Sequence, residues 1–126
     1  MFCYQCEQTK SRKGCVTVGV CGKTSQVSAL QDLLIYVLQG LSVWVHTGTN
    51  MGVHSSPDCD VFMMKAMFST LTNVNFDQDR FPGFIRQAVE YREAARAQVE
   101  QEYKRLGTPV DPALLEPGPA TWMPEK

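Results

Sequence analysis

The amino terminus carries four of the chain's five cysteines within its first 21 residues. They follow the pattern C-x2-C-x8-C-x5-C, and the fifth cysteine, Cys59, stands alone. Thiols clustered in this way hold a metal or form disulfides, and in a reducing compartment metal binding is the commoner use. The identity of the group held by this loop therefore decides what the chain can do. The candidate ligands are Cys3, Cys6, Cys15 and Cys21.

Length and composition place the chain among single-domain soluble proteins. It has 126 residues, of which 44% are hydrophobic and 20% charged. A net charge of −1 gives no reason to expect a nucleic acid or an anionic membrane as partner. We expect no signal peptide, because cysteines begin at position 3, and no membrane span, because polar residues interrupt the apolar stretch Val27–Val45. A cytoplasmic location is the default expectation.

Three helical segments are predicted after the cysteine-rich loop. The first runs from about Ser25 to His46, with Thr24 or Ser25 as its N-cap. The second begins at residues 56–58, and the third begins between residues 75 and 79 and ends near Gly107. The predicted fold class is all-α: an N-terminal cysteine-rich cluster-binding loop followed by a three-helix bundle.

The apolar residues of the first predicted helix are too many for one face. One stripe has the helical spacing, but Ile35, Tyr36, Val43 and Trp44 lie outside it. A helix that is apolar on nearly all sides is normally covered on nearly all sides. We therefore expect a face that this chain alone does not cover and that meets the remainder of a longer protein or a partner. In the second helix the face expected to pack consists of Val61, Met64, Phe68 and Leu71.

Proline marks a change of character after Gly107, since residues 108–126 contain five of the seven prolines. This composition is typical of a linker or an extended strap. The predicted organisation is a cluster-binding loop over residues 1–23, a three-helix bundle over 24–107, and a proline-rich linker or strap over 108–126 that leads toward a missing remainder.

Spacing alone leaves three uses of the four thiols open. A zinc site needs four tetrahedral thiolates, but five residues separate the second pair, where zinc knuckles have two to four. Disulfides are disfavoured by the compartment. An iron–sulfur cluster tolerates irregular spacing and favours glycines whose N–H groups approach the sulfurs. Three glycines lie beside the cysteines: Gly14, Gly19 and Gly22. The same segment has one carboxylate, Glu7, and four cations: Lys10, Arg12, Lys13 and Lys23.

The other residues of metal-binding type have ordinary structural interpretations. Cys59 falls in the first turn of the second helix, where it is more often a small packed hydrophobe than a reactive thiol. His46 and His54 have no fitting metal-ligand spacing. The methionines are interpreted as adaptable core residues: Met51, Met63, Met64 and Met67.

Several motifs resemble the amino terminus of the hybrid-cluster proteins, which are also called prismane proteins or hydroxylamine reductases. These motifs are MFCYQCEQT, then GC, VGVCGK and ALQDLLIYVLQGLS, and later NVNFDQDRF. The resemblance covers most of residues 1 to about 106, and the cysteine-rich loop is its most specific part. It implies that Cys3, Cys6, Cys15 and Cys21 ligate a cubane. Members with this compact spacing typically carry a [4Fe-4S] cluster, whereas a longer-spaced variant carries a [2Fe-2S] cluster instead.

The resemblance also implies an enzyme whose catalytic part lies elsewhere. Family members have several hundred residues, and their later domains hold the hybrid iron–sulfur–oxygen cluster where hydroxylamine is thought to be reduced. This chain would then be the electron-transfer portion of an oxidoreductase, with no catalytic residue of its own and a redox electron donor as partner. The alternative is a zinc-stapled helical interaction module without redox function.

Overall fold

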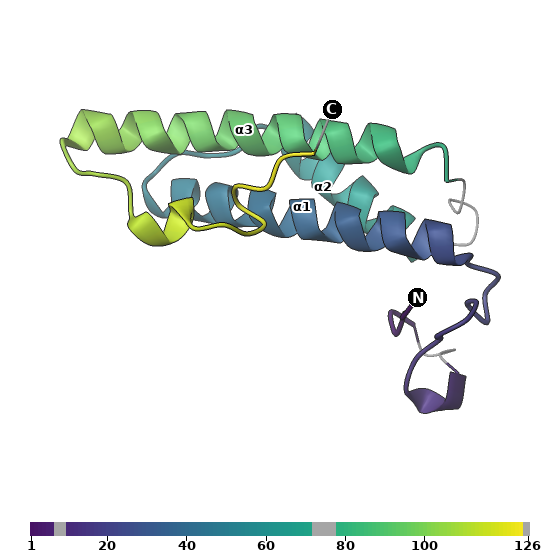
Figure 1. Ribbon diagram of the computed structural model, residues 1–126. Helices are drawn as coiled ribbons and strands as arrows, with labels where there is room; N and C mark the ends of the chain where they lie inside the picture. Colours follow the sequence, from purple (N-terminus) through teal and green to yellow (C-terminus); the bar gives the residue numbers. More distant parts are fainter. Residues whose placement is uncertain (7–9, 72–77, 125–126) are drawn as a thin grey trace.

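The computed structural model describes residues 1–6, 10–71 and 78–124. It contains the α-helices α1 (Ser25–Asn50), α2 (Pro57–Ser69) and α3 (Phe81–Leu106) (Figure 1). Two short 3-10 helices, η1 (Lys10–Arg12) and η3 (Pro112–Leu115), flank them. The described ranges contain no strand beyond one isolated bridge in the N-terminal loop. The prediction of an all-α fold behind a cysteine-rich loop is confirmed.

The two long helices, α1 and α3, lie antiparallel and make most of the interhelical packing, with α2 beside them (Figure 1). Leu34, Val37 and Leu41 of α1 are fully buried, and Phe81 and Ala88 of α3 meet them in one core. Each large side chain buried in this way contributes about 1.5–3 kcal/mol relative to exposure. The bundle therefore has a hydrophobic core made by the helices themselves.

Helix starts and stops follow local signals. Thr24 caps α1 by accepting a hydrogen bond from the Val27 N–H, and Ser56 caps α2 by accepting one from the Cys59 N–H. Gly107 ends α3 in the left-handed conformation at φ 69°. α1 continues four residues past its predicted end at His46. The predicted start of α3 falls partly on residues 75–77, outside the described residues, and the helix itself begins at Phe81.

The predicted packing face of α2 is wrong. Its four residues are exposed, with Met64 at 66% and Phe68 at 61%. The opposite face is buried and consists of Cys59, Phe62, Ala66 and Ser69. Three of these four side chains are small, so α2 can approach closely while Phe62 stacks on Tyr91 at a centroid distance of 5.0 Å. The interpretation of Met64 and Met67 as core residues is wrong for the same reason, because both lie on the outward face.

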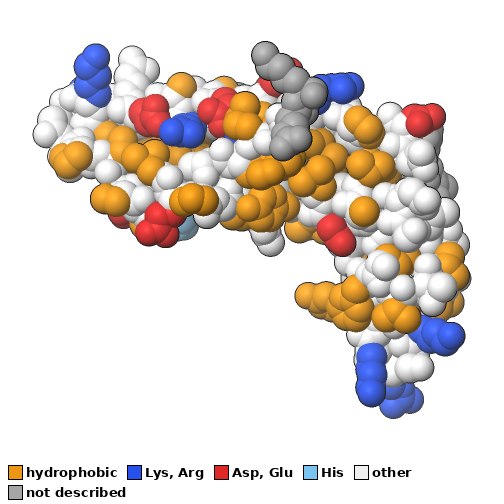
Figure 2. Space-filling view, viewed as in Figure 1, with side chains coloured by type: hydrophobic (Ala, Val, Ile, Leu, Met, Phe, Trp, Pro, Cys, Tyr) orange, Lys and Arg blue, Asp and Glu red, His pale blue; other side chains and the backbone are white. Residues whose placement is uncertain are grey.

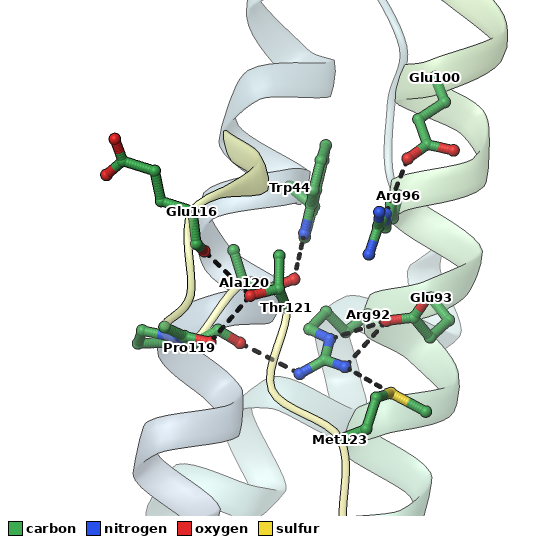
Figure 3. Close-up of polar contacts among 11 residues, drawn as sticks. Trp44, Arg92, Glu93, Arg96, Glu100, Glu116, Pro119, Ala120, Thr121 and Met123 are labelled. Atoms are coloured by element: carbon green, nitrogen blue, oxygen red, sulfur yellow. Dashed lines mark hydrogen bonds and ion pairs between the residues drawn. The ribbon is translucent and has the colours of Figure 1, made fainter. Parts of the chain in front are cut away.

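The segment that follows α3 folds back along the bundle, and we call residues 108–124 the strap (Figures 1 and 3). Trp44 donates its indole N–H to the Ala120 carbonyl at 2.8 Å, and Arg92 donates to the Pro119 carbonyl at 3.1 Å. The strap passes so close to α1 that a Cβ at Gly40 would meet the Pro119 carbonyl. Trp44 is 0% exposed, so its expected place on an uncovered face is wrong, whereas Val43 is exposed.

By length and composition alone, α1 could cross a membrane, with a mean hydropathy of 1.3 over its most apolar window. Half of that window is buried against the rest of the molecule. A buried apolar helix of this kind is what the centre of a helical bundle requires.

The N-terminal segment projects from the end of the bundle at which α1 begins (Figure 1). Lys and Arg side chains gather at its outer tip, whereas apolar side chains lie nearer the bundle (Figure 2). We call residues 1–6 and 10–23 the thiol loop. None of its residues belongs to the hydrophobic core cluster, so the loop and the bundle are packed separately.

Candidate metal centre

The backbone of the thiol loop brings two of the four predicted ligands side by side. Cys3 and Cys15 form an antiparallel bridge in which the Cys3 N–H donates to the Cys15 carbonyl at 2.9 Å and the Cys15 N–H donates back at 2.7 Å. The Phe2 ring occupies the place that a Cβ at Gly14 would take. A glycine is therefore required beside Cys15 for this close approach.

Cys15 is the most enclosed of the four predicted ligands, and its environment favours a thiolate. Hydrogen bonds from the backbone N–H groups of Lys10 and Val20 lower the pKa of its thiol, and the positive charges of Lys23 and Lys10 act in the same direction. Burial opposes these effects. The donors are not the glycines that the sequence pointed to. Gly19 instead allows close packing, since a Cβ there would crowd the Cys21 sulfur and the Lys23 side chain.

Lys23 connects the thiol loop to the bundle. Its ammonium lies 3.3 Å from the Cys3 sulfur, 3.1 Å from the Gln5 side-chain oxygen and 3.5 Å from the Thr70 carbonyl at the end of α2. The side chain is only 3% exposed. The sequence showed Lys23 as one of several loop cations but not as the one that contacts a sulfur.

The four predicted ligands are all free thiols, at different depths: Cys15 is buried, Cys3 and Cys21 are half-buried, and Cys6 is exposed. Within residues 1–6, 10–71 and 78–124, no three Cys, His, Asp or Glu side chains gather where they could share a metal ion. The donor set nevertheless fits a thiolate-bound group in type and number, with N–H donors and a cation at the sulfurs.

The residues set aside in the sequence lie away from this loop. Cys59 is buried in the core, where desolvation and the nearby Asp60 raise the pKa of its thiol. Its interpretation as a packed hydrophobe is confirmed, because the side chain is 5% exposed and belongs to the hydrophobic core cluster. His46 contacts Asn50 of its own helix at 3.3 Å, and His54 is exposed in the α1–α2 connection.

A groove of about 420 Å³ separates the thiol loop from α1. Phe2, Cys3 and Tyr4 form one wall, and Asp32 and Tyr36 lie on the α1 side. Burial raises the pKa of Asp32, and the charges of Lys23 and the amino terminus oppose this. The sequence did not predict this groove, because it depends on how the loop folds back toward the helix.

A loop that presents four free thiols ahead of an all-α bundle defines a helical protein with a cysteine-rich N-terminal end. Residues 1–111 match the Prismane/CO dehydrogenase family, and the chain belongs to that family. The matched region contains the whole thiol loop and all three helices.

Curated relatives are similar over almost the entire chain. A hydroxylamine reductase of Syntrophobacter fumaroxidans is 49% identical over 126 residues, which are 100% of this chain and 22% of that protein. A hydroxylamine reductase of Rhodospirillum rubrum is 44% identical over 124 residues, which are 98% of this chain and 22% of that protein. One of Halothermothrix orenii is 42% identical over 123 residues, which are 97% of this chain and 22% of that protein. The chain therefore spans about a fifth of the length of these relatives.

Proposed function

We propose that this chain is the electron-transfer portion of a hydroxylamine-reductase-like protein. In this proposal Cys3, Cys6, Cys15 and Cys21 hold a [4Fe-4S] cluster, and electrons pass from it to a catalytic hybrid cluster outside this chain. The observation that carries the proposal is that four free thiols share one loop within the family match. A cubane of this kind, when bound, supplies one-electron oxidation and reduction.

The residues of the loop have separate tasks in this proposal. The four thiolates bind iron, and the N–H groups of Lys10 and Val20 stabilise negative charge on the Cys15 sulfur. Lys23 places a cation at the Cys3 sulfur. The partners are a redox electron donor and the remainder of a longer protein or a partner that covers the exposed part of α1. A nucleic acid and a membrane are not proposed as partners. The location that we propose is the cytoplasm, where thiols stay reduced.

Metal analysis tests the cofactor directly. The anaerobically prepared chain is expected to be brown and to contain about four iron and four acid-labile sulfide per chain. Cys15→Ser should lower both sharply, because it removes the most enclosed ligand, whereas Cys59→Ser should leave both unchanged. A colourless chain with one zinc ion would instead establish the zinc-stapled interaction module.

The chain alone is expected not to reduce hydroxylamine. A cubane with four protein thiolates has no open iron for substrate, and reduction of a nitrogen–oxygen bond needs an open metal position and proton donors. The assay uses reduced methyl viologen as donor and follows ammonia, with the Syntrophobacter fumaroxidans relative as positive control. Turnover by the iron-replete chain that disappears in Cys15→Ser would contradict the electron-transfer assignment.

A further inference from the structure

Lys23 differs from the other cations of the thiol loop in its burial. Lys10, Arg12 and Lys13 are exposed, so water screens their charges. Lys23 is 3% exposed, and its charge acts through protein rather than through water. An ammonium is buried in this way only where polar partners replace its hydration shell.

Those partners come from two parts of the molecule. The Cys3 sulfur and the Gln5 side-chain oxygen belong to the thiol loop. Another partner is the carbonyl of Thr70, the C-cap residue of α2. Thr70 is itself buried, and its hydroxyl donates a hydrogen bond to the Met67 carbonyl at 2.7 Å. Carbonyls at the end of a helix carry partial negative charge and favour a cation there. One ammonium thus contacts both a predicted ligand in the thiol loop and a buried residue at the end of α2.

We propose that Lys23 is a positioning residue that docks the thiol loop on the end of α2 and, by holding a positive charge at the Cys3 sulfur, raises the reduction potential of the iron–sulfur group bound there. Only the effect on the reduction potential rests on the proposed function. Docking is a property of the chain itself, whereas the potential requires the bound group.

The electrostatic half follows from the charge of the reduced group. Each reduction adds one electron to thiolate-ligated iron and neither makes nor breaks a bond to Lys23. The added negative charge is stabilised by a cation close to a ligand sulfur in a poorly hydrated site. Removing that cation favours the oxidised form and lowers the potential.

A matched set of variants tests this half: Lys23→Met, Lys23→Arg and Lys13→Met, the last removing the same charge from an exposed position of the same loop. The anaerobically reconstituted 126-residue chain is titrated with dithionite and redox mediators while visible absorption and electron paramagnetic resonance are followed. The potential of Lys23→Met is expected to be lower than that of wild type, that of Lys13→Met nearly unchanged, and that of Lys23→Arg restored toward wild type. Equal shifts in Lys23→Met and Lys13→Met would overturn the inference.

Amide hydrogen exchange of the metal-free, reduced chain tests docking. Lys23→Met should speed exchange at the Cys3 and Cys15 amides, which bond each other across the bridge, and Lys13→Met should not. Unchanged exchange in Lys23→Met would refute docking. If Lys23→Met binds no iron, this measurement alone decides the inference.

The two measurements also separate this inference from the proposed function. Uptake of zinc instead of iron by wild type would overturn the proposed function and the electrostatic half together. The exchange result in the metal-free chain would still decide the docking half.

Discussion

Gln31 is an anomaly at the scale of single residues. It is 1% exposed, and neither its amide nitrogen nor its amide oxygen has a hydrogen-bond partner within the part of the chain that the structure describes. A buried polar group without a partner loses the free energy of its hydration and gains nothing in return. No sequence pattern identifies such a residue, because Gln31 has the same spacing on α1 as its apolar neighbours.

Replacing Gln31 with methionine should therefore stabilise the bundle. The two side chains have similar size and shape, and the substitution removes an unpaired amide worth about 1–3 kcal/mol. Gln39→Met, at an exposed position of the same helix, should change the free energy of unfolding by no more than about 0.5 kcal/mol. Urea denaturation followed by circular dichroism measures both. A destabilised Gln31→Met would mean that the amide has a role in the folded protein.

Individual residues also show which parts of the structure the sequence can predict. Thr24, Ser56 and Gly107 act through bonds within one helical turn, and each was found at or next to its predicted boundary. The buried face of α2 depends on which of two apolar faces fits α1 and α3, and a single helix does not contain that information. Trp44 was misplaced for a similar reason, since the strap that covers it lies 76 residues further along the chain.

The candidate site likewise has features that the sequence predicts and features that only the folded structure shows. The identities of Cys3, Cys6, Cys15 and Cys21 as ligands stay a prediction that rests on spacing and resemblance. The N–H donors at Cys15 and the contact of Lys23 with Cys3 are products of the folded loop. Spacing specifies which atoms can bind a group, whereas the surroundings that tune it come from the tertiary structure.

At the scale of elements, the strap depends on a close approach that only glycine permits. Gly40→Ala should destabilise the chain by about 1–3 kcal/mol, because its Cβ would collide with the Pro119 carbonyl. Gly83→Ala is the matched control, since a Cβ there meets nothing within 4 Å in α3. That change should stabilise the chain by about 0.5–1 kcal/mol through helix propensity alone. Urea denaturation of both variants measures the difference.

Truncation after residue 107 completes the test of the strap. Without residues 108–126, the added Cβ of Gly40→Ala has no Pro119 carbonyl to collide with. Its effect on the free energy of unfolding should then resemble that of Gly83→Ala. A Gly40→Ala variant that is equally destabilised with and without these residues would show that the collision with Pro119 is not the cause.

At the scale of the whole molecule, the bundle is expected to fold whether or not the thiol loop holds a metal group. The hydrophobic core cluster draws its residues from position 27 onward and includes none from the loop. Small metal-binding domains unfold without their metal because the metal takes the place of a hydrophobic core. This bundle has a hydrophobic core of its own. The far-ultraviolet circular dichroism of the Cys15→Ser chain should therefore retain the helical signal of wild type, while amide exchange speeds up in residues 10–23. Wholesale loss of helix would contradict the separation of loop and bundle.

The contact between Lys23 and Thr70 also has a consequence for synthesis on the ribosome. The two residues are 47 positions apart, and at translation rates of about 5–20 residues per second this interval lasts roughly 2–10 s. Throughout that interval the nascent chain already contains all four N-terminal cysteines and Lys23, but the Thr70 carbonyl that Lys23 contacts has not yet been made. The thiol loop therefore docks only after α2 has been synthesised. Until then its thiols are accessible to oxidants and to metal-delivery factors.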